Sequence, residues 1–123
     1  MKIEYASTKV EAQCTSLKEA RKLFGGDNGL AVSLMSRINS INSAETIKDI
    51  VLLPPLHFHV LKNKDGKNLD GYFAIDVKTI RDKWRIILQP LNEEEKAYDP
   101  LSIDKIADMV KIVEIREVSA HYE

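Results

Sequence analysis

Residues 72–90, YFAIDVKTIRDKWRIILQP, contain two segments in which apolar side chains occupy every second position. The segments cover residues 72–77 and 84–89, and polar residues separate them. A period of two is typical of β-strands that bury one face, and a polar connection is typical of a turn. We therefore predict two strands here, and we expect Pro90 to end the second of them.

The sequence before these strands has the periodicity of helices. Thr8 followed by Glu11 is a capping-box pattern, which predicts that a helix begins near residue 8. Apolar residues recur every three or four positions up to Gly25–Gly26, where we expect that helix to end. A second helix should begin at residues 27–28 and pack against the first as an antiparallel hairpin. Its buried stripe comprises Leu30, Leu34, Ile38 and Ile41.

Further strands are expected on both sides of this region. Lys2–Tyr5 predicts an opening strand, residues 57–61 a strand after the two prolines, and residues 109–118 a final strand. A short third helix over residues 43–51 is expected to end before Pro54. Because helices come early and strands late, we predict an α+β fold. Its N-terminal strand and two-helix hairpin would pack on a mainly antiparallel sheet of about four to five strands.

Composition limits the class of protein. The 123 residues are 44% apolar and 30% charged, which is typical of one folded domain over residues 1–123. Apolar runs such as Ile50–Leu53 are too short to cross a membrane, and the start of the chain does not have the pattern of a signal peptide. With Cys14 as the only cysteine, an internal disulfide and a cysteine-based zinc site are excluded. We therefore expect a cytoplasmic protein.

Charge is unevenly distributed along the chain, although the net charge is only −1. Residues 62–85 carry seven basic and four acidic side chains, whereas residues 86–123 carry four basic and nine acidic ones. The small total gives no overall attraction to nucleic acid. Contact with RNA would therefore depend on specific docking, with a weaker salt dependence than a strongly basic protein shows. Ordinary solvated charge is the alternative interpretation.

Polar side chains that the strands would bring together are the candidates for chemistry. Metal-free RNA cleavage needs a base for the ribose 2′-hydroxyl, a cation for the phosphorane oxygens and an acid for the leaving 5′-oxygen. His59, His121 or Tyr122 could transfer protons, and Arg85 could supply the cation. Candidates for RNA contacts are the basic and aromatic residues Lys62, Lys64, Lys67, Arg81, Lys83 and Tyr72.

Several of these features also have simpler interpretations. His57 and His59 lie two positions apart on one predicted strand, but no third ligand follows, so we expect no metal site and no cofactor. The glycine-rich segment 25–29 lacks the Lys and Ser/Thr of a phosphate-binding loop and is interpreted as a helix cap and turn. Trp84 is expected in the core. Arg85 could instead be the partner in a cross-strand ion pair.

Taken in order, several segments resemble a known family. Trp84–Pro90 (WRIILQP) is similar to the family's Tyr-Arg-Leu-Ile-Phe-Glu-Pro, and Gly71–Asp76 resembles its Gly-Gln-Phe-Ser-Ile-Asp. Other similar segments are Ile3–Ser7, Cys14–Thr15, Arg37–Asn39, Leu53–Pro55, His59–Leu61 and Glu114–Val118. The family is that of the HigB-type killer toxins in the RelE/ParE superfamily.

This resemblance implies a compact, microbial-RNase-like fold and a metal-independent endoribonuclease. The enzyme would cut mRNA on the ribosome, inhibit translation and arrest growth. Arg85 would hold the scissile phosphate, and His59 would reach the site. The implied partners are the ribosome, mRNA and a HigA-like helix-turn-helix antitoxin, in a complex expected to be a heterotetramer. Operator DNA would be contacted only through the antitoxin.

The end of the chain departs from the family pattern. Where the family often has Asp-Tyr-His, this chain has Ala120-His121-Tyr122, so the identity of the general base stays open. Two alternatives to a nuclease are therefore kept. One is a non-enzymatic, ParE-like inhibitor of a protein target such as DNA gyrase, and the other is a degenerate toxin that only binds its antitoxin.

Overall fold

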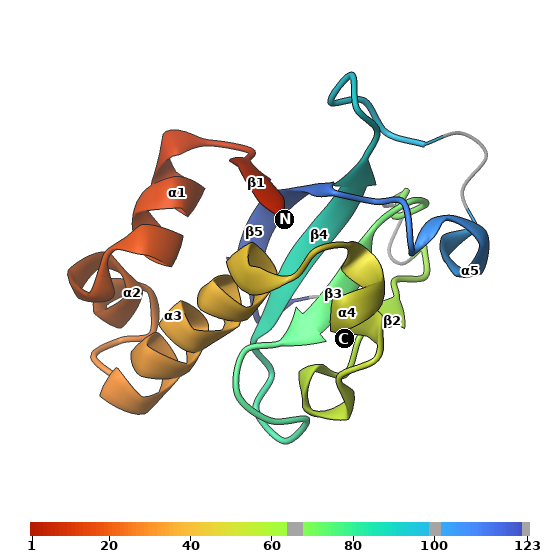
Figure 1. Ribbon diagram of the computed structural model, residues 1–123. Coiled ribbons are helices and arrows are strands. Elements are labelled where there is room, and N and C mark those ends of the chain that lie inside the picture. The colour runs from red at the N-terminus through yellow and green to blue at the C-terminus, as the bar shows by residue number, and fades with distance from the viewer. Residues whose placement is uncertain (64–67, 99–101, 122–123) are drawn as a thin grey trace.

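The computed structural model describes residues 1–63, 68–98 and 102–121, in which helices pack against a five-stranded sheet (Figure 1). The strands are β1 (Lys2–Tyr5), β2 (His59–Val60), β3 (Phe73–Asp76), β4 (Arg85–Leu91) and β5 (Ile112–Ser119). They lie in the order β1-β5-β4-β3-β2, and β1 pairs with β5 in parallel whereas the other neighbours are antiparallel. The predicted α+β architecture with a mainly antiparallel sheet is confirmed.

The helical elements cover one face of this sheet (Figure 1). They are α1 (Thr8–Thr15), α2 (Leu17–Leu23), α3 (Asn28–Ser43), α4 (Ile47–Val51), the 3-10 turn η1 (Pro54–Leu56) and α5 (Ile103–Ile106). The main core forms where α3 residues such as Leu34 meet Ile86 of β4 and Ile115 of β5. Trp84 packs against this core as expected, edge-on to Phe24 with 4.8 Å between ring centroids.

Where one long first helix was expected, the chain forms α1 and α2. The first begins at Thr8 as predicted, although Ser7 is the residue that caps it, by accepting a hydrogen bond from the Val10 N–H at 3.2 Å. Ser16 has an extended backbone and accepts a hydrogen bond from the Glu19 N–H at 3.3 Å. The hydroxyl of Ser16 supplies an acceptor for the backbone N–H of Glu19 in place of a helical carbonyl. Ser16 therefore ends α1 and caps the start of α2.

The turn between α2 and α3 depends on glycine. Gly25 and Gly26 have φ values of 63° and 94°, a region that side chains with a Cβ rarely adopt. Asp27 then caps α3 by accepting a hydrogen bond from the Leu30 N–H at 3.0 Å. The predicted stripe of α3 is largely confirmed, since Leu34, Ile38 and Ile41 are buried and Leu30 is half-buried.

Replacing Gly26 by alanine is expected to lower the free energy of unfolding by about 1 kcal/mol. The cause is backbone strain, because no described atom beyond the two neighbouring residues lies within 4 Å of the Cβ that would be added. Urea unfolding followed by circular dichroism measures the change. Asn39→Ala, at an exposed position inside α3, is the control and should not destabilise the protein, since alanine favours a helix. An equal loss in both variants would contradict the strain argument.

The expectation that Pro90 ends a strand is wrong. β4 continues to Leu91, and Pro90 lies opposite Val113 of β5. The pairing of β3 with β4 reaches only as far as Leu88, so β4 has a single neighbour at Pro90. A proline can be placed there because the strand is locally at an edge, where a missing N–H need not remove a ladder bond.

The strand expected over residues 57–61 is shorter, because His57 adopts a left-handed conformation with φ 51° and ψ 52°. This residue follows η1, and its N–H donates to the Pro54 carbonyl at 3.0 Å. β2 therefore begins only at His59, and the two histidines do not lie on one strand as predicted. The final strand is likewise Ile112–Ser119, shorter at its start than predicted.

The sheet face opposite the helices, the outer face, has its own small apolar cluster. Tyr72 packs against it, and its buried members are Leu61, Leu69, Ala74 and Ile87.

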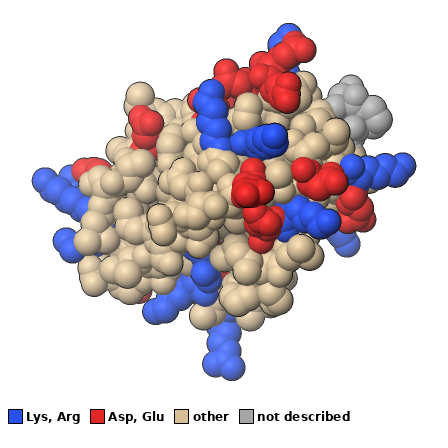
Figure 2. Space-filling view, in the orientation of Figure 1, with Lys and Arg blue, Asp and Glu red and all other residues tan. Residues whose placement is uncertain are grey.

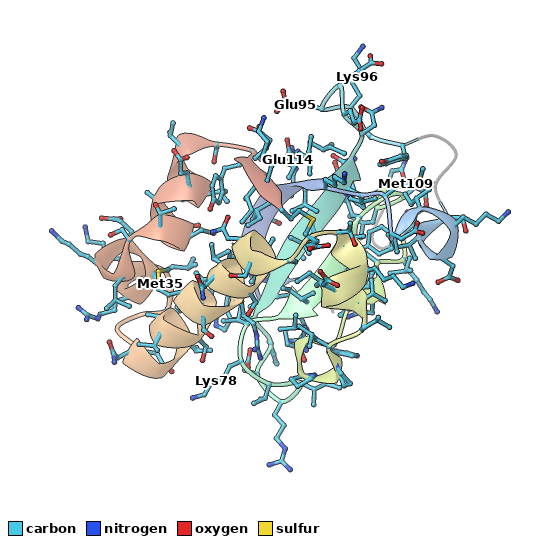
Figure 3. All side chains as sticks on the ribbon, in the orientation of Figure 1. Met35, Lys78, Glu95, Lys96, Met109 and Glu114 are labelled. Carbon is cyan, nitrogen blue, oxygen red and sulfur yellow. The ribbon has the colours of Figure 1, made fainter. Side chains whose placement is uncertain are left out.

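Acidic side chains gather toward the top of the view in Figure 2, whereas mainly Lys and Arg project at the bottom. Figure 3 likewise shows Glu95 and Glu114 above and Lys78 below. No helix among the described residues is long and apolar enough to cross a membrane.

Candidate functional site

Strand register brings the candidates Arg85 and His59 to one end of the sheet, together with two other polar residues. Asp76 at the end of β3 lies opposite Arg85 at the start of β4, and Arg85 lies opposite Ser119 at the end of β5. His59 of β2 lies opposite Ala74, two residues before Asp76. Because side chains alternate along a strand, these positions share the outer face of the sheet.

His57 and His59 form a pair at this end, with ring centroids 4.5 Å apart and planes tilted by 30°. The left-handed turn at His57 directs its carbonyl to Nδ1 of His59, at 2.7 Å. Nδ1 of His57 lies 3.2 Å from Oδ1 of Asp76. A carbonyl and a carboxylate only accept hydrogen bonds, so both Nδ1 atoms must be the donors. Each ring, when neutral, therefore carries its lone pair on Nε2.

Neither Nε2 atom is used by the hydrogen bonds that hold the two rings. The His57 side chain is 43% exposed, His59 is half-buried, and neither Nε2 atom has a hydrogen-bond partner among the described residues. An imidazole held in one tautomer can accept a proton or, once protonated, donate one. His57 was not among the sequence candidates for catalysis, because its role depends on a backbone turn and on a distant carboxylate.

Behind the histidines, Asp76 and Arg85 form a buried ion pair. Nε of Arg85 lies 3.1 Å from Oδ1 of Asp76, the oxygen that also meets His57, and each side chain of the ion pair is 2% exposed. The other guanidinium nitrogens donate at 2.8–3.3 Å to three carbonyls of the β3–β4 loop, those of Ile80, Asp82 and Trp84. The buried Arg85 side chain thus contacts both the backbone of the β3–β4 loop and the carboxylate of Asp76.

These contacts bear on the role that the resemblance implies for Arg85. An arginine that binds a phosphate must present its N–H groups to the ligand, often two at once. In this structure the guanidinium is buried and directed at protein acceptors. The observed arrangement is the cross-strand ion pair considered above, and phosphate binding by Arg85 stays a prediction.

The candidates for RNA contacts lie at both ends of the sheet. Arg81 and Lys83 are near the end that holds Asp76 and Arg85, whereas Lys62 and Tyr72 lie toward the opposite end of β2 and β3. Arg81 and Lys83 are exposed on the β3–β4 loop that Arg85 holds, and Lys62 is exposed shortly after β2. Tyr72 is half-buried against the outer apolar cluster. The two further lysines, Lys64 and Lys67, lie outside the described residues.

Of the two C-terminal candidates, the structure describes only His121. His121 is exposed beyond β5, and its N–H donates to Oγ of Ser119 at 3.1 Å. Because β5 and β2 are three strand spacings apart, their backbones are separated by about 14 Å. His121 follows β5 and is not part of the close pair formed by His57 and His59. Tyr122 lies outside the described residues.

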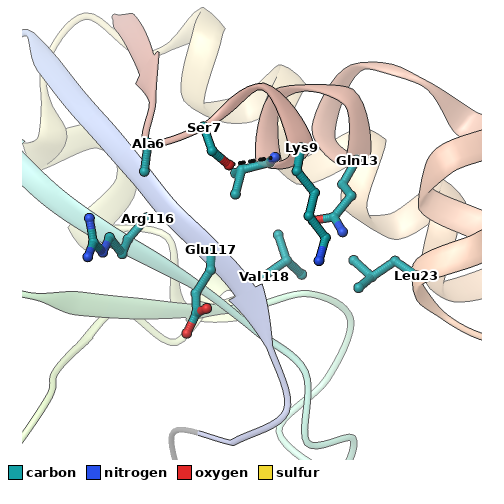
Figure 4. A pocket seen from close by; sticks show the side chains of 9 residues that line it. Ala6, Ser7, Lys9, Gln13, Leu23, Arg116, Glu117 and Val118 are labelled. Carbon is teal, nitrogen blue, oxygen red and sulfur yellow. Dashed lines mark hydrogen bonds between the residues drawn. The ribbon is translucent and has the colours of Figure 1, made fainter. Parts of the chain in front are cut away.

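A cavity of about 390 Å³ lies elsewhere, at the other edge of the sheet (Figure 4). Lys9 and Gln13 of α1, Leu23 of α2 and Val118 of β5 contribute to its lining. None of the residues that line it is a site candidate from the sequence. The cavity and the histidine pair are therefore separate features.

Cys14 and Tyr5 are not further candidates for proton transfer or nucleophilic attack. Burial raises the pKa of the Cys14 thiol and of the Tyr5 hydroxyl to about 12, so both groups are neutral near pH 7. Cys14 is 1% exposed and belongs to the core, as its place on the apolar stripe indicates. Within the described ranges, no group of three or more His, Cys, Asp or Glu residues is arranged to hold a metal ion.

Comparison with known proteins does not assign this chain to a family. No family model matches the sequence, and no curated protein matches it either. The inference of function therefore depends on the fold, on the residues gathered around His57 and His59, and on the resemblance described above.

Proposed function

We propose that this protein is the toxin of a type II toxin–antitoxin system, a metal-independent endoribonuclease that cuts mRNA on the ribosome. A HigA-like antitoxin would neutralise it. The observation that carries the proposal is the close pair formed by His57 and His59, each with its Nε2 atom available. Exposed Arg81 and Lys83 on the adjacent loop support it, because RNA binding requires positive charge near the cleaved phosphate.

In the proposed reaction His59 acts as the base. Its Nε2 takes the proton of a ribose 2′-hydroxyl, and the resulting oxygen attacks the adjacent phosphorus. The bond to the 5′-oxygen breaks, and protonated His57 donates a proton to that oxygen. The products are a 2′,3′-cyclic phosphate and a 5′-hydroxyl, so atoms and charges balance. Asp76 accepts the hydrogen bond from Nδ1 of His57 and so orients the ring.

A non-enzymatic inhibitor of a protein target is the second candidate. The buried position of Arg85 favours it, because a nuclease stabilises phosphorane charge with a cation that the strand arginine does not present here. In the nuclease proposal that cation comes from Arg81 or Lys83 on the loop. The two candidates therefore differ in what happens to mRNA in the cell.

Induction of the protein in a bacterial host is expected to arrest growth and to produce cuts in translated mRNA at codon-linked positions. Primer extension on cellular transcripts detects the cuts. The control is the same transcript without its start codon, which should stay intact because cleavage requires the ribosome. DNA damage without cuts would support the inhibitor and contradict the nuclease. Unchanged growth with intact mRNA and DNA would support a degenerate toxin.

A further inference from the structure

Arg37 of α3 contacts both segments that carry the His57–Asp76 contact. Its Nε donates to the Asp76 carbonyl at 3.1 Å, and its Nη2 donates to the carbonyls of Lys78 at 3.0 Å and Pro55 at 3.4 Å. Pro55 belongs to η1 and lies two residues before His57. The Asp76 carbonyl belongs to the residue whose carboxylate meets that histidine. One guanidinium therefore connects the backbone of η1 to the backbone at the end of β3, the two segments whose relative position sets the His57–Asp76 contact.

The sheet alone does not hold His57 against Asp76. The ladder between β2 and β3 consists of the pairs His59–Ala74 and Val60–Phe73, so the chain before His59 leaves the ladder. Contacts from outside the sheet must then set the position of η1 relative to the end of β3. Arg37 supplies such contacts, and it does so from a helix whose buried face is firmly packed in the main core.

The chemistry of arginine suits this role better than that of lysine. A guanidinium is planar, stays charged and presents several N–H groups in a rigid fork, so it can reach separate acceptors at once. Among the described residues, the polar contacts of Arg37 are all with backbone carbonyls. Arg37 therefore acts on the path of the backbone and does not neutralise a neighbouring carboxylate.

We infer that Arg37 is a positioning residue, which holds η1 against the end of β3 and so keeps Nδ1 of His57 on the Asp76 carboxylate. Without it, η1 shifts, the hydrogen bond from His57 to Asp76 is lost, and the ring is released from its tautomer. The consequence for RNA cleavage rests on the proposed function. The consequence for the His57 tautomer does not, because it concerns the free protein.

The first test measures the tautomer of His57 by NMR of the imidazole nitrogens in the free protein. The wild type is expected to carry the proton of the neutral ring on Nδ1, and Arg37→Gln is expected to populate both tautomers. Arg37→Lys should give an intermediate result, since one ammonium replaces part of the fork. The matched control is Arg21→Gln, which removes an arginine whose Nε donates to Asn28. This control should leave the His57 signals unchanged.

The second test measures cleavage of translated mRNA by the same variants. Arg37→Gln is expected to lower the cleavage rate at saturating ribosomes about tenfold, with the half-saturating concentration unchanged, because the reacting group is misplaced rather than removed. A wild-type His57 tautomer in folded Arg37→Gln overturns the inference, whatever the activity. If that variant does not fold, a wild-type tautomer in Arg37→Lys overturns it. If the wild type does not cleave, the proposed function fails and the tautomer still decides the role of Arg37.

Discussion

Replacing Arg85 by alanine is expected to lower the free energy of unfolding by about 3–5 kcal/mol. The substitution leaves the Asp76 carboxylate, which is 2% exposed, without the cation that lies 3.1 Å from it. It also removes the donors to the loop carbonyls of Ile80, Asp82 and Trp84. A buried charge that loses its partner costs far more than the pair contributes when it is intact.

Urea unfolding at neutral pH measures this loss. Arg81→Ala, an exposed arginine on the same loop, is the matched control and should change stability by less than about 0.5 kcal/mol. Adding Asp76→Asn to Arg85→Ala should recover part of the loss, because the uncompensated charge is then removed. Wild-type stability of Arg85→Ala would contradict the buried ion pair and would favour the phosphate-binding role implied by the resemblance.

This expectation changes how catalysis can be tested. The sequence alone suggests Arg85→Ala as the variant that abolishes activity in a folded protein. The buried position of Arg85 predicts instead that this variant loses activity by losing structure. Side chains that are not fully buried, and whose reactive atoms the fold does not use, are therefore the informative ones, and the two histidines at the end of the sheet meet that requirement.

His59→Gln is expected to lower the rate of mRNA cleavage by about 10²–10⁴-fold, the usual contribution of a general acid or base. Glutamine is polar and close to histidine in size. It has no group that exchanges a proton near neutral pH, so the chemistry is removed while the local structure is kept. Single-turnover cleavage of a reporter mRNA on purified ribosomes measures the rate.

Two further variants separate the possible acid–base pairs. His57→Gln should lower the rate to a similar extent, whereas His121→Gln should have little effect, because the proposed reaction takes both proton transfers from His57 and His59. Thermal unfolding of each variant checks that the fold is kept. Full activity of His59→Gln would contradict the assignment of the base. A large loss in His121→Gln alone would transfer the role to the C-terminal residues that the sequence also indicated.

Much of the fold could be predicted because its signals are local and repeated. The alternation in residues 72–90 identified β3 and most of β4, and the stripe at Leu34, Ile38 and Ile41 identified α3. The parallel pairing of β1 with β5 joins segments more than a hundred residues apart, and no local pattern encodes that pairing. Two other features depend on backbone hydrogen bonds. They are the break between α1 and α2 at Ser16, and the continuation of β4 through Pro90.

The alternation of apolar and polar side chains was enough to place His59 and Arg85 on β-strands. The structure was needed to show that the β3–β4 loop buries Arg85, that Arg85 pairs with Asp76, and that a left-handed turn brings His57 beside His59. The burial and the partners of a polar side chain depend on segments distant in sequence, whereas periodicity reports only the face on which the side chain lies.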